Sequence, residues 1–332
     1  MLKKVETSPL LSVRNLRIEF PTRRGTLVAV DDISFDIAPG EILGVVGESG
    51  AGKSLTGAAI IGLLEPPGRI AQGEITLEGQ RIDNLPYEEI RRIRGRRIGA
   101  IFQDPLTSLN PLYSVSRQLV ETIQTHLPLN DKEARARALE LLDEVGIPGA
   151  GERIDHYPHQ FSGGMRQRVV IALALCAEPR LIIADEPTTA LDVTIQAQIL
   201  HLLRTLARER DVAVLFTTHD LGTTYEICDR VTVMYAGQEM ETAPSDGFFN
   251  TPSHPYTRDL LQSLPSREHG IKGIPGDIPA LISPPGGCRF HPRCTAASER
   301  CSVERPDHTQ ISERHNVRCF HPVAHKSVGA AS

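Results

Sequence analysis

The chain has 332 residues, of which 40% are hydrophobic and 23% are charged, and its formal net charge is −5. This composition is typical of a soluble globular protein with two domains, or with one large domain and an appendage. A slightly acidic chain without a long Lys/Arg run argues against a nucleic-acid partner and a polybasic membrane anchor. The longest apolar run, Val169–Ala177, is far shorter than the ~20 residues of a membrane-spanning helix, and Met1–Glu6 does not begin a signal peptide.

Apolar runs alternate with helical patterns over most of the chain, which is typical of an α/β fold. We predict a main domain over residues 8–250 and a small irregular, Cys-rich C-terminal module over residues 251–332, where Pro and Gly interrupt every segment. Near the start, Leu11–Phe20 and Val28–Ile37 alternate apolar and polar residues as half-buried strands do. These two segments predict an antiparallel layer packed beside the core of the main domain.

The octet at residues 47–54 fits the Gly-x4-Gly-Lys-Ser/Thr phosphate loop. A short apolar strand, Glu41–Val46, precedes it, and Leu55–Leu64, rich in Ala, Ile and Leu, follows it as a helix. This unit points backbone N–H groups and the positive end of a helix at one anion, so an ordinary glycine turn is a poor alternative. Lys53 adds a positive charge for the outer phosphates, and the hydroxyl of Ser54 can ligate Mg²⁺. The predicted nucleotide-binding residues are Gly47, Glu48, Ser49, Gly50, Ala51, Gly52, Lys53 and Ser54.

Two further residues near strand ends are weaker candidates. Phe20, at the end of the first strand, is equally well interpreted as stacking on a nucleotide base or as filling the core. Gln103 follows the apolar segment Ile98–Phe102, and its amide is placed to reach Mg²⁺ or water. The helical stretch that follows predicts an inserted helical subdomain at about residues 104–176, with Asp131 as a helix N-cap.

Ser162, Gly163 and Gly164 precede the apolar helical segment Val169–Cys176. Serine is a good N-cap, and two glycines leave the end of a helix open to close approach. The segment therefore predicts a second anion-binding helix end in a chain that already has one. A plain capped helix is the alternative, and on these residues alone it is the better supported one.

A second strong signal is Leu181–Glu186, a continuous apolar run that ends in two carboxylates. It is typical of a central parallel strand whose carboxyl end opens onto a ligand crevice. Asp185 is placed to hold Mg²⁺, directly or through water, and Glu186 to polarise an attacking water. The buried strand Val212–Thr218 delivers His219 to the same edge, where an imidazole can bond the terminal phosphate or the water.

The order of these motifs resembles the ATP-binding subunits of ABC transporters over residues 10–245. The resemblance rests on the phosphate loop, Gln103, Ser162-Gly163-Gly164, Leu181–Glu186, Ala190-Leu191-Asp192 and His219. It implies a P-loop ATPase fold, and a head-to-tail pair in which each Ser-Gly-Gly motif closes on the ATP held by the opposite subunit. Phe161 and Met165 depart from the usual Leu-Ser-Gly-Gly-Gln signature, but the anion-binding donors remain. The catalytic residues implied are Glu186, which orients water, together with Lys53, Gln103 and His219.

A narrower resemblance is to the ATPases of dipeptide/oligopeptide importers, and within them to the first of two paralogous ATPase subunits. It is carried by Met165–Arg168, Phe102–Pro111, Ala184–Gln198, His254–Thr257 and Cys288–Cys294. It implies a paralogous ATPase partner in a heterodimer, two transmembrane permease subunits and an extracytoplasmic substrate-binding protein. The chain is then expected as a peripheral protein on the cytoplasmic face of the plasma (inner) membrane.

Two alternatives to a peptide importer stay open at this point. The same ATPase role could serve a nickel chelate, glutathione or another solute, because nothing in this chain contacts cargo. A soluble, non-transport ABC ATPase is the other alternative. Proteins of that kind usually carry two ATP domains in one chain or a long coiled-coil insert, and this sequence has neither.

Four cysteines near the end of the chain, Cys288, Cys294, Cys301 and Cys319, suggest a metal site. Lasting disulfides are rare in the cytosol, and the close Cys pair of most zinc sites is missing here. Four thiolates also suit an iron–sulfur cluster. Some peptide-importer ATPases resembling this chain carry a [4Fe–4S] cluster at this motif, which favours that cofactor, with zinc and free thiols as alternatives. A metal would supply folding energy to a module poor in apolar residues.

Overall fold

Two β-sheets and the helices around them make up the computed structural model, which describes residues 8–189, 191–264 and 273–323. The larger sheet has eight strands in the order β11-β12-β10-β9-β3-β8-β7-β6. The five strands from β9 to β6 run parallel, and β10, β12 and β11 continue the sheet in antiparallel fashion. These strands are β3 (Ile42–Val46), β6 (Ile98–Ile101), β7 (Leu181–Asp185), β8 (Ala213–Thr217), β9 (Arg230–Tyr235), β10 (Gln238–Pro244), β11 (Thr309–Ser312) and β12 (His315–Val317).

The central strands of this sheet are the apolar runs of the sequence. Every residue of β3 and β8 is buried, as is each of the first four residues of β7, because helices cover both faces of a parallel sheet. The carboxylate of Asp185 terminates β7 at partial burial. Strands predicted from continuous apolar runs were therefore correct in position to within one or two residues.

The smaller sheet is antiparallel and has the order β2-β1-β4-β5. Strand β1 pairs with β2 in a register that places Leu11 opposite Ile37 and Phe20 opposite Leu27. The antiparallel layer predicted from alternating residues is present, and two strands not recognised in the sequence extend it. Its strands are β1 (Leu11–Thr22), β2 (Gly25–Ile37), β4 (Arg69–Leu77) and β5 (Gln80–Arg81).

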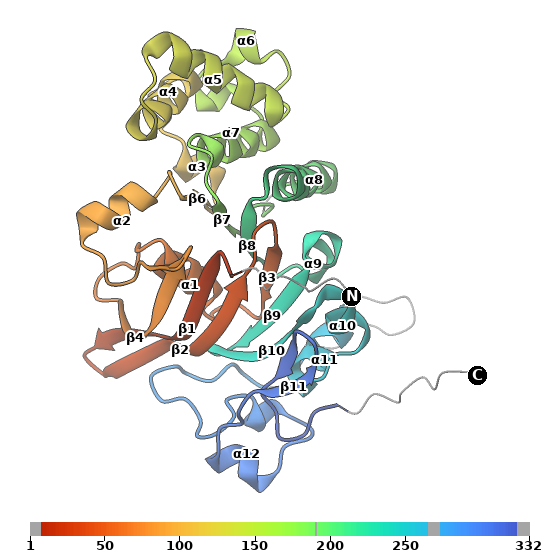
Figure 1. Ribbon diagram of the computed structural model, residues 1–332. Helices are drawn as coiled ribbons and strands as arrows, with labels where there is room; N and C mark the ends of the chain where they lie inside the picture. The colour runs from red at the N-terminus through yellow and green to blue at the C-terminus, as the bar shows by residue number, and fades with distance from the viewer. Residues whose placement is uncertain (1–7, 190, 265–272, 324–332) are drawn as a thin grey trace, which may run out of the picture.

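Helices α3 to α7 lie between β6 and β7 in the chain and gather at one end of the molecule (Figure 1). No helix within the described ranges has the length and apolar character needed to cross a membrane. The helices are α1 (Lys53–Ile60), α2 (Tyr87–Ile93), α3 (Pro105–Ser108), α4 (Val115–His126), α5 (Asp131–Glu144), α6 (Ala150–Arg153), α7 (Gly163–Leu175), α8 (Val193–Arg210), α9 (Leu221–Ile227), α10 (Ser245–Asn250), α11 (Pro255–Gln262) and α12 (Glu299–Val303), with 3₁₀ turns η1 (Pro158–Gln160) and η2 (His291–Arg293).

The N-cap of α5 is Asn130, and the prediction of Asp131 was wrong by one residue. Asn130 has an extended backbone, and its side chain accepts a hydrogen bond from the N–H of Glu133 at 3.0 Å. The Glu133 side chain in turn accepts from the N–H of Asn130 at 3.0 Å, which completes a capping box. The acidic Asp131 follows in the first turn, where its negative charge interacts favourably with the positive end of the helix dipole.

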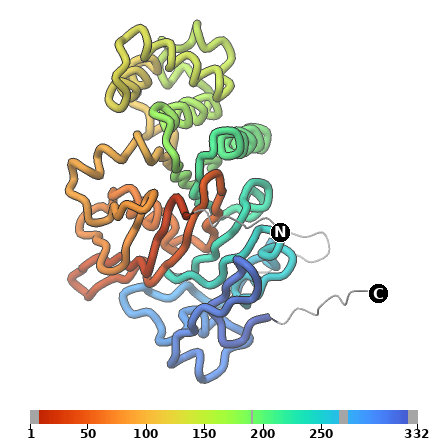
Figure 2. The backbone as a smooth tube through the Cα atoms, viewed as in Figure 1, coloured from red at the N-terminus to blue at the C-terminus, as the bar shows by residue number. Residues whose placement is uncertain are grey.

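The described residues after 250, at 251–264 and 273–323, are more regular and better integrated than an irregular module would be. Strand β12 pairs with β10, so the larger sheet continues into this part of the chain. Tyr256 and Phe290 are fully buried and belong to the same hydrophobic cluster as the parallel strands. The segment packs along β10, at the end of the molecule opposite α4 to α6 (Figure 2). Aromatic residues of this segment therefore belong to the core of the main sheet.

Candidate functional site

The carboxyl ends of β3, β6, β7 and β8 meet at one edge of the larger sheet, because neighbouring parallel strands point the same way. A cavity of about 520 Å³ opens at this edge. The structure thus brings together residues that lie far apart in the sequence. The cavity is lined by Ser49–Leu55, Gln103, Glu186 and His219.

The phosphate loop turns sharply into α1. Gly47 has φ +149°, and a Cβ there would lie 2.1 Å from the carbonyl oxygen of Met234, so this position requires glycine. Gly52, with φ +100°, is the N-cap of α1 and provides no side chain to bond the first N–H groups of the helix. Those N–H groups are therefore free to donate to an anion in the cavity.

Lys53 is buried at the start of α1, and its Nζ donates to the carbonyl oxygens of Gly47 at 2.8 Å and Glu48 at 3.3 Å. Burial lowers the pKa of its ammonium group, while Glu186 and Asp185 oppose that shift. Its positive charge is thus held at the floor of the cavity by two carbonyl groups. A phosphate oxygen is a stronger acceptor than either carbonyl and can replace them.

Asp185 has two hydroxyl donors on one carboxylate oxygen. The Oγ of Ser54 donates to its Oδ1 at 3.0 Å, and the Oγ1 of Thr217 donates to the same oxygen. Hydroxyl and carboxylate oxygens are the ligands that Mg²⁺ prefers, so this donor set fits that ion. Thr217 was not recognised in the sequence, although its place at the end of β8, next to β7, was the available signal.

Glu186 accepts hydrogen bonds from three directions. The Nε2 of Gln103 donates to Oε2 at 2.8 Å, the Oγ1 of Thr189 donates to Oε2 at 3.0 Å, and the Nδ1 of His219 lies 3.0 Å from Oε1. Burial by itself would raise the pKa of Glu186, but the hydrogen bonds from His219 and Thr189 outweigh it and lower that pKa. The carboxylate is consequently charged at neutral pH. Its backbone is left-handed, with φ +47°, an uncommon conformation for a residue other than glycine.

The Ser-Gly-Gly motif lies outside this cavity. Ser162 and Gly163 are exposed, and Ser162 caps α7 by accepting from the N–H of Met165 at 3.3 Å. Asp192 likewise caps α8, accepting from the N–H of Ile195 at 2.9 Å. Ala190, part of the same predicted motif, lies outside the described residues. The open end of α7 is thus available to a ligand that this cavity does not hold.

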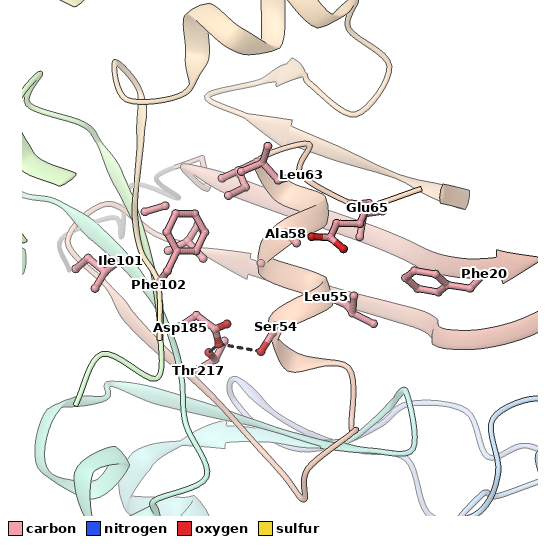
Figure 3. A pocket seen from close by; sticks show the side chains of 15 residues that line it. Phe20, Ser54, Leu55, Ala58, Leu63, Glu65, Ile101, Phe102, Asp185 and Thr217 are labelled. Carbon is pink, nitrogen blue, oxygen red and sulfur yellow. Dashed lines mark hydrogen bonds between the residues drawn. The ribbon is translucent and has the colours of Figure 1, made fainter. Parts of the chain in front are cut away.

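Phe20 lines a different, largely apolar cavity of about 300 Å³, which Ser54, Asp185 and Thr217 also line (Figure 3). Leu55 and Glu65 line the same space, and the Phe20 ring packs so closely on Gly68 that a Cβ there would lie 2.6 Å from it. Phe20 does not line the phosphate cavity. Its position favours the interpretation of an aromatic residue that packs beside the helix.

The four C-terminal cysteines line one small cavity of about 10 Å³, and each has a free thiol. Nevertheless, over the described ranges no group of three or more His, Cys, Asp or Glu side chains is arranged to hold a metal ion. Burial raises the pKa of the Cys288 and Cys294 thiols, and that of Cys319 to about 12. The structure therefore gives no support for a bound metal or cluster beyond the convergence of Cys288, Cys294, Cys301 and Cys319.

Comparison with protein families finds two matches. The family described as "ABC transporter" matches residues 30–189, and the one described as "Oligopeptide/dipeptide transporter, C-terminal region" matches residues 240–301. The first match covers the phosphate loop, Asp185 and Glu186. The second covers α11 and three of the four cysteines.

Curated relatives match almost the whole chain. A putative peptide import ATP-binding protein of Brucella abortus is 47% identical over 92% of this chain and 93% of its own length. The oligopeptide transport ATP-binding protein OppD of Bacillus subtilis is 46% identical over 97% of this chain and 92% of its own. The dipeptide transport ATP-binding protein DppD of Escherichia coli is 43% identical over 95% of this chain and 97% of its own length.

Solved structures match the larger part of the fold. An ATP-binding cassette in a dimeric post-hydrolysis state, bound to ADP and phosphate, has a TM-score of 0.64 and 28% sequence identity. The match covers 71% of this chain and 98% of that one. The protein cbiO1 of Clostridium perfringens, from an ABC transporter complex, has a TM-score of 0.63 and 28% identity, and the match covers 73% of this chain and 91% of that one.

Proposed function

The chain belongs to the family of ATP-binding proteins of oligopeptide and dipeptide ABC transporters, and from this premise we propose how its residues use ATP. It is an ATPase subunit that hydrolyses ATP to power the import of dipeptides or oligopeptides. The observation that carries the proposal is the single cavity shared by the phosphate loop, Gln103, Glu186 and His219.

ATP binds as substrate with its phosphates on the N-terminal end of α1. The N–H groups of the phosphate loop and the Lys53 ammonium group hold the phosphate oxygens. Ser54 and Asp185 would hold Mg²⁺, which would neutralise phosphate charge. Lys53 exchanges the carbonyl oxygens of Gly47 and Glu48 for phosphate oxygens when ATP enters.

Glu186 orients the attacking water and polarises it. Its carboxylate is charged and is held by Gln103 and His219, so its lone pairs have a defined direction. When water attacks, His219 and Lys53 stabilise negative charge that develops on the γ-phosphate. The chemistry depends on positioning and electrostatics, and no covalent bond to the protein is formed.

We place the second half of the site on a partner subunit. Ser162, Gly163 and Gly164 sit at the open N-terminal end of α7 and would donate to the ATP bound by a second, paralogous ATPase subunit. The dimeric state of the similar ATP-binding cassette supports this arrangement. The remaining partners of a peptide importer are membrane permeases and a substrate-binding protein. We propose that the chain lies against the permeases at the cytoplasmic face of the membrane.

We propose residues 8–250 as the ATP-binding domain, with the helices at about 104–176 as an inserted subdomain, and 251–332 as a C-terminal module. The separation of the two family matches and the gathering of α3 to α7 support this division. We also propose that Cys288, Cys294, Cys301 and Cys319 hold a [4Fe–4S] cluster, with zinc as the alternative. Their convergence on one cavity supports it, although the present space has room for about one water molecule, so the thiols would have to move outward.

Metal analysis of anaerobically purified protein tests the C-terminal proposal. About four iron and four sulfide per chain, with visible absorption, would indicate the cluster, and one zinc per chain would indicate the alternative. Protein that contains neither metal and binds neither on reconstitution would overturn a metal site at these cysteines.

The Glu186→Gln variant tests the ATPase mechanism. Glutamine keeps the shape and can still bond His219, but it cannot polarise water as a carboxylate does. We expect Mg·ATP affinity within about twofold of the parent and a hydrolysis rate lower by about 10²-fold or more. Calorimetry and phosphate release measure the two quantities. A variant that hydrolyses ATP at the parental rate would show that Glu186 does not have this role.

A further inference from the structure

Glu48, the second residue of the phosphate loop, places a carboxylate beside a site for a polyanion. A free carboxylate here would repel the phosphates of ATP. Its side chain is, however, turned away from the phosphate cavity, which it does not line. The Nη1 of Arg293 donates to Glu48 Oε2 at 2.8 Å, and the Nη2 donates to Oε1 at 3.2 Å. The two charges form a two-pronged pair of the kind that fixes geometry as well as charge.

Arg293 belongs to the C-terminal part of the chain and is held on every side. Its Nε donates to the carbonyl oxygen of Pro275 at 2.8 Å, Nη2 to that of Ile274 at 3.0 Å, and Nη1 to the Oη of Tyr235 at 3.2 Å. With the two bonds to Glu48, all five N–H groups of the guanidinium have acceptors. The side chain is 4% exposed. A lysine, with three donors on one atom, could not reproduce this arrangement.

A second contact from the C-terminal part reaches the same loop residue. The Oη of the buried Tyr256 accepts a hydrogen bond from the backbone N–H of Glu48 at 3.2 Å. The Tyr256 ring packs on Phe290, with ring centroids 5.1 Å apart, and Phe290 lies three residues before Arg293. One compact group of C-terminal residues therefore holds both the side chain and the N–H of Glu48.

The remaining polar group of Glu48 bonds within the phosphate loop. Its carbonyl oxygen accepts from Lys53 Nζ at 3.3 Å and from the N–H of Ala51 at 3.1 Å. The placement of Glu48 consequently influences the lysine and the loop backbone that face the cavity. A shift of this residue would be felt directly by the groups proposed to hold phosphate.

We propose that Arg293 is a positioning residue for nucleotide binding, which holds the Glu48 carboxylate outside the phosphate cavity. Nucleotide affinity then depends on the C-terminal part of the chain. The inference rests on the proposed function, since it assumes that ATP binds at the phosphate loop. The cysteine motif gains a link to that loop, because Arg293 lies between Cys288 and Cys294.

The experiment compares Mg·ATP binding by four full-length proteins, the parent, Arg293→Ala, Glu48→Ala and the double variant. We expect Arg293→Ala to raise the Kd by about tenfold, because its unpaired carboxylate can turn toward the phosphates. The double variant should return to within about threefold of the parent, since no carboxylate is left to repel ATP. In steady-state hydrolysis, the KM of Arg293→Ala should rise while kcat changes by less than about twofold.

Arg289→Ala is the matched control. The Arg289 side chain is also 4% exposed and also comes from the C-terminal part, but it pairs with Asp31 of β2 at 3.0 Å. It should lower the melting temperature as Arg293→Ala does, yet leave the Kd for Mg·ATP within about twofold of the parent. Arg293→Lys, which keeps the charge without the fork, should lie between the parent and Arg293→Ala in affinity.

Each outcome bears on a distinct claim. If the parent binds no Mg·ATP, the proposed function fails before the role of Arg293 is tested. If the parent binds and Arg293→Ala binds equally well, the positioning role is wrong. If Arg293→Ala binds weakly and the double variant binds equally weakly, the loss comes from general disruption of the C-terminal part, which also overturns the proposal.

Discussion

Asp185 and Glu186 are adjacent in the chain, yet their side chains serve different partners. Asp185 ends β7 and faces the hydroxyls of Ser54 and Thr217, whereas the left-handed backbone at Glu186 turns the next carboxylate toward His219. In the proposed mechanism, one dipeptide would thereby provide both a ligand for a cation and a base for water. Two neighbouring acids can point in different directions because β7 ends at Asp185 and Glu186 is already outside the strand.

Replacing Thr217 with valine tests the orientation of Asp185. Valine has nearly the same shape but removes one of the two donors on Asp185 Oδ1. We expect the Mg²⁺ concentration for half-maximal ATP hydrolysis to rise about three- to tenfold, which corresponds to the loss of about 1 kcal/mol from one hydrogen bond. Thr217→Ser keeps the hydroxyl and should resemble the parent. Equal Mg²⁺ dependence in the valine variant and the parent would contradict the assigned role.

At the scale of elements, helices α1 and α7 begin in different ways. Helix α1 starts after Gly52 and has no side chain on its first N–H groups, which leaves them to a ligand. Helix α7 starts after Ser162, whose side chain accepts a hydrogen bond from one of the first N–H groups, that of Met165. The first end lines the phosphate cavity, and the second lies outside it.

The cap of α7 can be kept while its proposed contact with a partner's ATP is removed. Aspartate is as good an N-cap as serine, so the free energy of unfolding of Ser162→Asp should lie within about 0.5 kcal/mol of the parent value. Its carboxylate would repel the partner's nucleotide, and we expect ATPase activity of the assembled transporter to fall more than tenfold. ATP binding by the isolated chain should be unchanged because Ser162 does not line its cavity. Full activity in the assembled variant would refute the contact.

At the scale of the whole molecule, basic residues of the C-terminal part dock on carboxylates of earlier strands and loops. These pairs join parts of the sequence that are more than 70 residues apart, and several are buried. They hold this segment against the sheet. The pairs are Arg289 and Arg305 with Asp31, Arg318 with Asp32, Arg314 with Glu41, Arg293 with Glu48, and His315 with Glu241.

Glu241 is the most buried of these carboxylates, and its removal should loosen the docking. It accepts from His315 Nε2 at 2.7 Å and from the N–H groups of Ser253 at 2.7 Å and His254 at 2.8 Å. Burial would raise the pKa of Glu241, but these hydrogen bonds outweigh it and lower the pKa below 4.5. The stabilisation is therefore present above about pH 4.5 and is lost as pH falls through the lowered pKa.

We expect Glu241→Gln to lower the free energy of unfolding by about 2–4 kcal/mol at pH 7. As pH falls below about 4.5 and then through the lowered pKa of Glu241, the difference from the parent should shrink, because protonation of the carboxylate removes its contribution from the parent as well. Urea unfolding at pH 7 and pH 4 measures both effects. Glu88→Gln, at an exposed position of α2, is the control and should change stability by less than about 0.5 kcal/mol. A difference that does not depend on pH would contradict the charged state assigned to Glu241.

The sequence by itself determined the phosphate loop, the pair of carboxylates at the end of β7 and the parallel strands, because each depends on neighbouring residues. A glycine turn between strand and helix, or an apolar run ending in acids, is complete within about ten residues. Gln103, Glu186 and His219 could also be expected together, since they end strands that run parallel.

Only the tertiary structure decided which residues hold these groups in place. Thr217 on Asp185, Arg293 and Tyr256 on Glu48, and Phe20 beside α1 are contacts across distant segments, for which local pattern carries no information. The C-terminal part shows the same limit most clearly. Its Pro- and Gly-rich sequence lacks periodicity, and its order comes from charge pairs and aromatic packing against a sheet that the rest of the chain provides.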